Sequence, residues 1–297
     1  MNLKQIRFAL AVAQEQNFTR AAQRCHTVQS ALSHQIAKLE EELGCVLFER
    51  TSRQVRLTEA GRAFIGPAEQ LLAAQTHLLD TMDALKGEVS GTLTVGIIST
   101  LNAIDVIGQL ASFTERYPRV NIRMYVAMSE KLLEDVQQLR TDVAFVGLWP
   151  GDSAALRLPN RLLADEPLVA LLSPTHPYAN CPQLTLSELA QVPLVDFYAG
   201  AGARRQTDSA FSEAGITRHV SFEIDHIEWL ESIVRRSLAA GIVPLSHAQH
   251  AKDLISVPIE NAPRRQVLCV WQNSLSTAAE RFLAFAQEEG NKTPLNQ

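Results

Sequence analysis

Short polar side chains follow one face of the segment at residues 28–43, and their types suit hydrogen bonding to the edges of nucleic-acid bases. Drawn as a helix of about 100° per residue, the segment has a polar front that carries Ser30, Ser33, His34, Ala37 and Lys38. Its back is apolar and carries Leu32, Ile36, Leu39 and Leu43. A helix with a buried back and short polar groups in front fits the major groove of DNA, which admits one helix. We expect contacts to bases from four residues, and contacts to phosphates or the minor groove from two more: Gln29, Ser30, Ser33 and His34, then Lys38 and Arg53.

The neighbouring elements are those needed to hold such a helix. Thr19 is expected to cap a short helix at residues 20–24, because its hydroxyl can accept an unpaired backbone N–H. Residues 26–27 form the turn into the long helix, which is expected to end at Gly44. The helix at residues 3–15 is apolar on most sides, so it should be covered on both, once by the helix pair and once by a later helix.

A small hairpin is predicted directly after the long helix. Residues 47–50 and 55–58 have the composition of two short strands, and the hairpin carries Arg50, Arg53 and Arg56. Arginines in a hairpin beside a DNA-reading helix can reach phosphates or the minor groove. The hairpin is therefore predicted to be a wing.

This region resembles the N-terminal domain of the LysR-type transcriptional regulators. The resemblance rests on Phe-Thr-x-Ala-Ala at residues 18–22, Gln-x-Ala-Leu-Ser at residues 29–33 and Leu-Phe-Glu-Arg at residues 47–50, and it runs for about 60 residues without a gap. It implies a winged helix-turn-helix that pairs with a copy of itself on a pseudo-palindromic operator in double-stranded DNA. It also implies recruitment of RNA polymerase as the output.

Two residues of the DNA-reading helix depart from the family pattern. Ser30 replaces the usual proline, which fixes φ at a helix start, and adds a hydroxyl that can bond a phosphate or a base. His34 replaces the usual arginine and so lacks the fork that suits guanine. We expect a different operator preference, and DNA binding that weakens more with rising pH than in a His34→Arg variant.

A long helix is predicted from Thr58 to about residue 86. Apolar residues recur along it at alternating spacings of four and three, with one polar member: Phe64, Ala68, Leu71, Gln75, Leu78, Met82 and Leu85. This heptad pattern predicts dimerisation through the helix rather than a core helix of a single domain. Pro67 lacks a backbone donor, so a bend or break is expected near Gly66–Pro67.

After a hinge at residues 88–91 the chain alternates strand and helix, and its Val/Ile runs are typical of parallel strands covered on both faces. Helix starts are marked by two capping boxes, at Thr185 with Glu188 and at Thr277 with Glu280. Because the last helix returns to the first lobe, two crossover strands and a cleft between two α/β lobes are expected. This layout resembles the effector-binding domain of the same family and, more distantly, periplasmic solute-binding proteins.

A small-molecule effector is expected at the carboxyl ends of the strands, where ligands bind in open α/β sheets. The expected effector-binding residues follow the first strands of each lobe and are Ser99, Thr100, Ser129, Phe197, Tyr198 and Arg204. Simple helix capping is an equally good explanation for Ser99, Thr100 and Ser129. The two aromatic residues hint at an effector with an apolar part.

The predicted architecture is an N-terminal all-α winged helix-turn-helix with a linker helix, followed by a C-terminal α/β two-lobed, periplasmic-binding-protein-like effector domain. The expected boundaries are residues 1–58 for the DNA-binding domain, 59–87 for the linker and dimerisation helix, 88–91 for the hinge and 92–297 for the effector domain. Within it, lobe I is expected at about residues 92–161 and 267–297, and lobe II at about residues 162–266. A homodimer or homotetramer is expected.

Composition limits the other classes. Residues 1–66 carry nine Lys/Arg and six Asp/Glu, a net charge of +3 within a chain of −5, so the attraction to phosphate stays local. Four cysteines without a CxxC pair argue against a metal site, and no cofactor is expected. No enzyme motif and no catalytic residue is found, and a transport-type solute-binding protein would not carry a helix-turn-helix. The absence of a signal peptide or apolar span predicts a cytoplasmic protein that does not contact a membrane.

Overall fold

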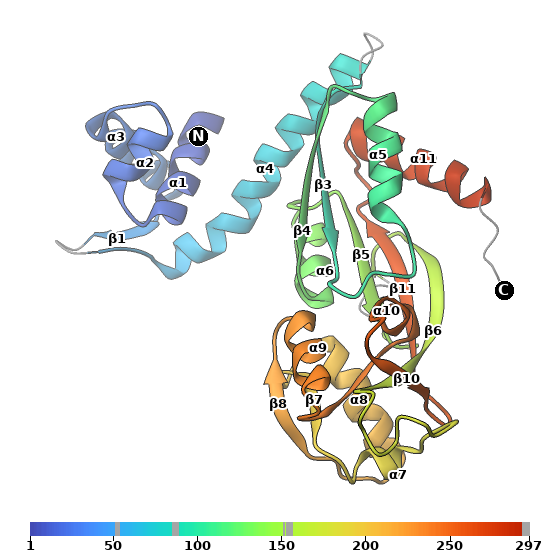
Figure 1. Cartoon of the computed structure of the whole chain (residues 1–297). Helices are drawn as coiled ribbons and strands as arrows, with labels where there is room; N and C mark the ends of the chain where they lie inside the picture. Colours follow the sequence, from blue (N-terminus) through green and yellow to red (C-terminus); the bar gives the residue numbers. More distant parts are fainter. Residues whose placement is uncertain (51–53, 85–88, 151, 153–156, 293–297) are drawn as a thin grey trace. The chain divides into compact units, whose positions relative to one another are not determined.

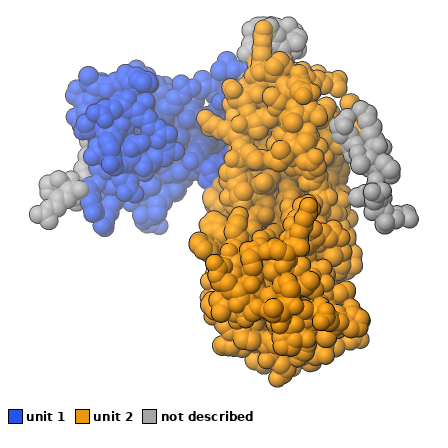
Figure 2. Space-filling view, in the orientation of Figure 1, with its two compact units in different colours: residues 1–88, 138–140 blue, residues 89–137, 141–297 orange. Residues whose placement is uncertain are grey.

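The computed structural model of the chain describes residues 1–50, 54–84, 89–150, 152 and 157–292. The chain folds into two compact units, which Figure 2 colours separately: unit 1 comprises residues 1–88 with 138–140, and unit 2 comprises residues 89–137 with 141–297. Among the described residues, no helix combines the length and the apolar character needed to cross a membrane.

Unit 1 is a bundle of helices with one hairpin (Figure 1). Its elements are α1 (Leu3–Glu15), α2 (Phe18–Arg24), α3 (Gln29–Leu43), β1 (Phe48–Arg50), β2 (Val55–Leu57) and α4 (Glu59–Ala84). The strands β1 and β2 pair antiparallel, with Phe48 opposite Leu57, so the predicted hairpin is confirmed. One core joins the first three helices to the hairpin and includes Val12, Ala21, Leu32, Ile36, Leu39, Leu47 and Phe48.

The helix α3 forms where it was predicted, with the predicted apolar back. Leu32, Ile36 and Leu39 are completely buried, and they recur at the helical spacing that places them on one side. The helix ends at Gly44, whose φ of 68° is the left-handed conformation that glycine adopts without strain. Leu43, which we expected on the buried back, is 38% exposed, since it lies a turn beyond the last core residue of the helix.

Two helix caps lie earlier in the chain than predicted. Asn17 Oδ1 accepts the N–H groups of Thr19 and Arg20 at 2.9 and 3.0 Å, so α2 begins at Phe18 and Thr19 is not its cap. At α11 (Thr277–Lys292), Ser276 Oγ accepts the N–H of Ala279 at 3.2 Å, so Ser276 rather than Thr277 caps the helix. In both places two neighbouring residues have capping side chains, and the residue whose oxygen reaches an N–H two or three positions on becomes the cap.

The helix α4 continues through Pro67, so of the expected bend or break the break does not occur. Ala68 is buried against Ile6 and Leu10 of α1, and this packing holds the helix together where the proline removes a hydrogen bond. The same contact supplies the second cover for α1 that its apolar sequence predicted. The cover on the other side comes from α2 and α3.

The predicted heptad seam of α4 divides into two parts. One part is used within the chain, because Phe64 and Ala68 pack on α1. Gln75, the polar member, likewise accepts a hydrogen bond from Arg7 Nη2 at 2.9 Å. The other part is apolar and exposed and consists of Leu71 (45% exposed), Leu78 (61%) and Met82 (50%). Leu85 lies outside the described residues.

Unit 2 contains a nine-stranded sheet with helices on its faces (Figure 1). Its first elements are β3 (Gly91–Ile97), α5 (Val106–Arg116), β4 (Val120–Val126), α6 (Ser129–Gln137), β5 (Val143–Leu148) and β6 (Asn160–Leu172). Then follow α7 (Leu186–Leu189), β7 (Leu194–Phe197), α8 (Gly202–Glu213), β8 (Val220–Ile224), α9 (Ile227–Arg235), β9 (Ala240–Pro244), α10 (Leu245–His250), β10 (Ile255–Pro258), β11 (Arg264–Trp271) and α11. The sequence did not reveal α8, α10 or β10.

The strand order β4-β3-β5-β11-β6-β9-β7-β8, with β10 beside β6, produces two α/β lobes. In lobe I, β3 runs parallel to β4 and β5, and in lobe II, β7 runs parallel to β8 and β9. The parallel strands predicted from the Val/Ile runs are therefore confirmed. The strands that join the lobes, β6 and β11, are antiparallel to each other and to their other neighbours.

The strand β6 belongs to both lobes. Its residues 160–167 pair with β11, and from Leu168 onward it pairs with β9 and β10 instead. The change of partner falls between Pro167, which is opposite Arg264, and Leu168, which is opposite Pro244. Proline cannot donate to a ladder, but the next N–H, of Leu168, donates to Pro263 O at 2.8 Å.

Candidate functional site

The outer face of α3 is polar and accessible. Gln29, Ser30, His34 and Lys38 are exposed and Ser33 is half-buried, so the structure brings together five of the six residues expected to contact DNA. The sixth, Arg53, lies outside the described residues. This face is polar because Leu32, Ile36 and Leu39 point into the core.

The hairpin is tied to α3 by one carboxylate. Glu40 Oε1 accepts the N–H groups of Leu47 and Phe48 at 2.7 and 3.2 Å, which places the first strand of the hairpin beside the helix. The hydroxyl of Thr58 donates to Val46 O at 2.7 Å and accepts the N–H of Gly61 at 2.9 Å, so it joins the hairpin to the start of α4. These bonds give the helix and the hairpin one fixed arrangement, which a DNA-reading surface requires.

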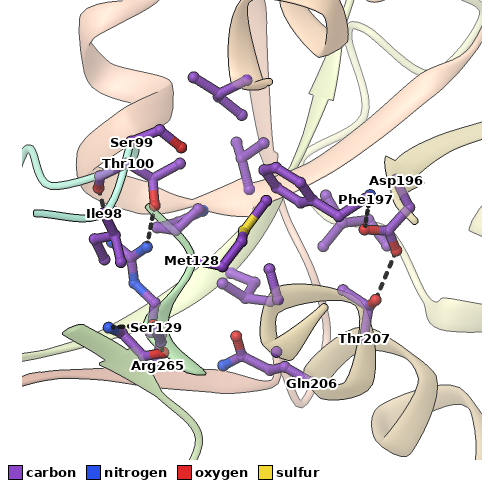
Figure 3. A pocket seen from close by; sticks show the side chains of 18 of the residues that line it. Ile98, Ser99, Thr100, Met128, Ser129, Asp196, Phe197, Gln206, Thr207 and Arg265 are labelled. Carbon is purple, nitrogen blue, oxygen red and sulfur yellow. Dashed lines mark hydrogen bonds between the residues drawn. The ribbon is translucent and has the colours of Figure 1, made fainter. Parts of the chain in front are cut away.

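A small cavity, partly open to solvent, lies between the two lobes of unit 2. Figure 3 shows Thr100, Ser129 and Arg265 on one side, Asp196, Phe197 and Thr207 on the other, and Met128 between them. Most of its wall is apolar and includes Ile98, Met128, Leu168, Phe197, Ile227 and Ile242. An apolar cavity with a few convergent polar groups is the usual form of a small-molecule site.

Four of the six residues expected to bind an effector line this cavity, and they are Ser99, Thr100, Ser129 and Phe197. The structure does not bring the other two to the cavity wall. Tyr198 is 43% exposed beyond the end of β7. Arg204 instead donates to Phe197 O at 2.9 Å and pairs with Asp208 at 3.0 Å, so it joins the end of β7 to α8.

Two of the lining hydroxyls are already hydrogen-bonded within the chain. Ser129 Oγ donates to Gly147 O at 2.9 Å and accepts the N–H of Gly147 at 3.1 Å, which ties the start of α6 to β5. Thr100 Oγ1 and its carbonyl oxygen both accept hydrogen bonds from Arg265. Both residues therefore have structural bonds within the chain, although neither set of bonds is the helix cap that the sequence suggested as the alternative to ligand binding. For Ser99 no such bond is found among the described residues.

A buried ion pair at the cavity, between Arg265 and Glu166, was missed by the sequence reasoning. The two residues are opposite each other on β11 and β6, and Arg265 Nη2 lies 2.6 Å from Glu166 Oε1. Glu166 Oε2 also accepts the N–H of Ser246 at 2.8 Å, so the pair links both crossover strands to the start of α10. Burial lowers the pKa of the Arg265 guanidinium, and the neighbouring carboxylate opposes this shift. The sequence offered little signal for this pair, because β6 also carries Arg161 and Asp165 and β11 also carries Arg264.

A second buried charge, Asp196, lines the cavity from lobe II. Its carboxylate accepts the N–H of Phe197 and the hydroxyl of Thr207, each at 2.7 Å, and lies 2.8 Å from Arg218. Burial raises the pKa of Asp196, whereas Arg218 and the hydrogen bonds oppose this shift. The network fixes the end of β7 against α8, and so positions Phe197.

One histidine connects the lobes at the back of this region. His247 is buried, and its Nδ1 lies 2.9 Å from Asn102 Nδ2, which belongs to the loop after β3. Its Nε2 lies 3.0 Å from Glu231 Oε1 on α9. Burial lowers the pKa of His247, and the Glu231 carboxylate opposes this shift. This contact was not foreseen from the sequence.

Comparisons with known proteins match both parts of the chain. The family model "LysR substrate binding domain" matches residues 86–291, and "Bacterial regulatory helix-turn-helix protein, lysR family" matches residues 3–62. The RuBisCO operon transcriptional regulator of Allochromatium vinosum is 30% identical over 295 residues, which cover 97% of this chain and 96% of that protein. The hydrogen peroxide-inducible genes activator of Escherichia coli O6:H1 is 28% identical over 277 residues, which cover 92% of this chain and 90% of that protein.

The fold is shared with a solved structure that contains DNA. Full-length CbnR in complex with its target DNA superposes with a TM-score of 0.71 at 23% identity, over 97% of this chain and 99% of that one. Together with the polar face of α3 and the cavity between the lobes, these matches settle the class of the protein. The chain belongs to the LysR family of bacterial helix-turn-helix regulators, and it is a DNA-binding transcriptional regulator with an effector-binding domain and not an enzyme.

Proposed function

We propose that α3 reads the operator through the major groove. The observation that carries this proposal is the division of the helix into a buried apolar back and an exposed front of short polar side chains. Base contacts are assigned to Gln29, Ser30, Ser33 and His34, and phosphate or minor-groove contacts to Lys38 and Arg53. Domains are assigned as residues 1–58 for DNA binding, 59–87 for the linker, 88–91 for the hinge and 92–297 for the effector domain.

Pairing of two chains completes the DNA-binding form in this proposal. The exposed part of α4, with Leu71, Leu78 and Met82, offers an apolar face of the kind that pairs with a second helix. Two copies of α3 then contact a pseudo-palindromic operator, in a homodimer or a homotetramer. RNA polymerase is the proposed partner for the output.

The effector is proposed to bind in the cavity between the lobes, with contacts from Ser99, Thr100, Ser129 and Phe197. A ligand that binds one arrangement of the lobes more tightly than another shifts the population toward that arrangement, and this is how occupancy would alter DNA binding. Tyr198 and Arg204 are assigned supporting roles at the end of β7, because neither lines the cavity.

The name of one relative, the hydrogen peroxide-inducible genes activator, suggests peroxide sensing by a thiol, which the buried Cys269 of this chain does not support. Unit 2 contains Cys181 and Cys269, which pack in different hydrophobic clusters. Burial raises the pKa of Cys269 to about 12, so almost none of it is the thiolate that reacts with peroxide. A reversibly bound small molecule is therefore the better-supported signal.

The test is a binding titration on the DNA upstream of the chain's own gene, with unrelated DNA of equal length as competitor and the salt concentration varied. Wild type should bind the upstream DNA in preference to the competitor, with affinity falling as salt rises. Ser33→Tyr should lose this preference without changing the oligomeric state, because the bulkier side chain prevents α3 from seating in the groove. Ser209→Tyr, an equal change at an exposed position of α8, is the matched control. Loss of the oligomer in Ser33→Tyr, or an unchanged preference, would refute the assignment of α3.

A further inference from the structure

The charges buried in the cavity wall are already neutralised by partners within the chain. Arg265 is paired with Glu166 at 2.6 Å, and Asp196 is paired with Arg218 at 2.8 Å. All four side chains are less than 10% exposed. Removing a charged ligand from water is costly unless the site supplies an opposite charge that is free to pair with it. Neither Arg265 nor Asp196 is therefore free to pair with a charged ligand.

The third charged residue of the wall, Glu130, stands at the edge of the cavity and is also paired. Its Oε1 receives a hydrogen bond from Arg205 Nη2 across the gap between the lobes. The guanidinium of Arg205 in turn lies over the ring of Trp149, 5.5 Å from its centre. A Cβ at Gly202 would come within 2.4 Å of Glu130 Oε1, so the carboxylate rests on the first residue of α8.

Glu130 therefore occupies the position that an anionic ligand would be expected to take. It belongs to the first turn of α6, and its carboxylate touches the first turn of α8. Both helices begin at the cavity, since Ser129 and Gly202 line it, and helix N-termini attract negative charge. The chain supplies that negative charge itself, so the two helix starts already have the counter-charge that an anionic ligand would bring.

Three hydroxyl groups of the wall are likewise hydrogen-bonded within the chain. Thr207 Oγ1 donates to Asp196 and accepts from Arg218, in the way that Ser129 and Thr100 are bonded to Gly147 and Arg265. These hydroxyls thus have structural partners already. What remains for a ligand is the hydroxyl of Ser99 and an apolar wall formed by residues such as Ile98 and Phe197.

We infer that the effector of this cavity is an uncharged, largely apolar small molecule, and that Glu130 excludes anions from it. The inference rests on the proposed function, in that it concerns the ligand of the proposed effector site. Glu130 acts as a specificity residue, because its carboxylate replaces the ligand's negative charge at the starts of α6 and α8. Arg205 holds that carboxylate in place.

The experiment compares matched acids and amides of equal shape with the full-length chain at neutral pH. The probes are acetate and acetamide, isobutyrate and isobutyramide, benzoate and benzamide, and phenylacetate and phenylacetamide. Thermal unfolding identifies the pairs that bind, and a titration of tryptophan fluorescence then gives each Kd, since Trp149 stacks on Arg205 at the cavity edge. We expect the amide of a binding pair to bind at least about tenfold more tightly than its acid, which corresponds to ~1.4 kcal/mol.

The variants change this acid-to-amide ratio in opposite directions. Glu130→Gln removes the carboxylate, so the preference for the amide should fall about tenfold or reverse. Arg205→Gln leaves Glu130 unpaired, so acids should be excluded more strongly than in wild type. Glu134→Gln removes an exposed carboxylate from the same helix without touching the cavity, and it should keep the wild-type ratio. A purely structural role of Glu130 would weaken the acid and the amide equally and leave the ratio unchanged.

Tighter binding of acids than of amides in wild type, binding of no member of any pair, or an unchanged ratio in Glu130→Gln would overturn the inference. Operator binding is measured on the same preparations. A chain that binds its operator but prefers acids refutes only the inference about the effector. A chain that fails to bind its operator refutes the proposed function.

Discussion

Replacing Arg265 by methionine should strongly destabilise unit 2, because it leaves the buried carboxylate of Glu166 without its partner. The side chains of both residues are less than 10% exposed, and the contact between them is 2.6 Å. Removing one member of a buried ion pair typically lowers the free energy of unfolding by about 3–5 kcal/mol. Arg265→Met also removes two hydrogen bonds to Thr100, which adds to the cost.

The second single variant, Glu166→Gln, should cost a similar amount, since it leaves the guanidinium buried and unpaired. The double variant should lower the free energy of unfolding by about 2 kcal/mol less than the two single variants together, because it leaves no buried charge without a partner. The difference isolates the interaction between the two residues from their other contacts.

Urea unfolding followed by tryptophan fluorescence is the suitable assay. The chain has three tryptophans, and Trp149, Trp229 and Trp271 all belong to unit 2, so the signal reports that unit alone. The slope against urea must stay unchanged for the comparison to hold. A cost below about 1 kcal/mol for Arg265→Met, or strictly additive costs in the double variant, would show that the pair is not the buried, mutually dependent interaction described above.

Three further outcomes are expected. Leu78→Asp on the exposed part of α4 should shift the chain toward the monomer in analytical ultracentrifugation. The control Gln70→Asp, at an exposed polar position of the same helix, should not. An unchanged oligomer in both variants would show that α4 is not part of the interface. Burial lowers the pKa of His247 in the folded chain. As the pH falls below about 6.5, His247 is protonated in the unfolded chain before it is protonated in the folded chain. The free energy of unfolding should therefore fall with pH. His247→Gln should reduce that loss and His226→Gln, at an exposed position, should not; equal pH slopes in urea unfolding would contradict it. Hydrogen peroxide should leave Cys269 unmodified in the folded chain and oxidise it in urea, because burial in the folded chain raises the pKa of Cys269 to about 12. Mass spectrometry of the peptide that contains Cys269 measures the oxidation. Oxidation of Cys269 in the folded chain would contradict the prediction.

Local signals in the sequence predicted the elements well. The spacing of Leu32, Ile36 and Leu39 placed α3, and Gly44 marked its end, because periodicity and a left-handed cap are properties of neighbouring residues. The alternation of Val/Ile runs with helices likewise predicted two α/β lobes. Where a local rule admitted two answers, as with Asn17 and Thr19, the choice depended on geometry that no pattern contains.

The candidate site was predicted less completely, because it depends on contacts between distant residues. Glu166 and Arg265 are separated by 99 positions and meet only through the register of β6 and β11. Arg204 followed the first strand of lobe II as expected, yet its acidic neighbours hold it away from the cavity. The role of His34 in operator preference stays a prediction.

The passage of β6 through both lobes has a mechanical consequence. The strand changes partner between Pro167 and Leu168, and the carboxylate of Glu166 is anchored one residue before that point. A rotation of one lobe against the other would therefore twist a continuous strand at this change of partner, beside the buried ion pair. Paired strands of this kind should resist such a twist more than a flexible linker would. We therefore expect any rotation of the lobes on ligand binding to be small and to reverse when the ligand leaves.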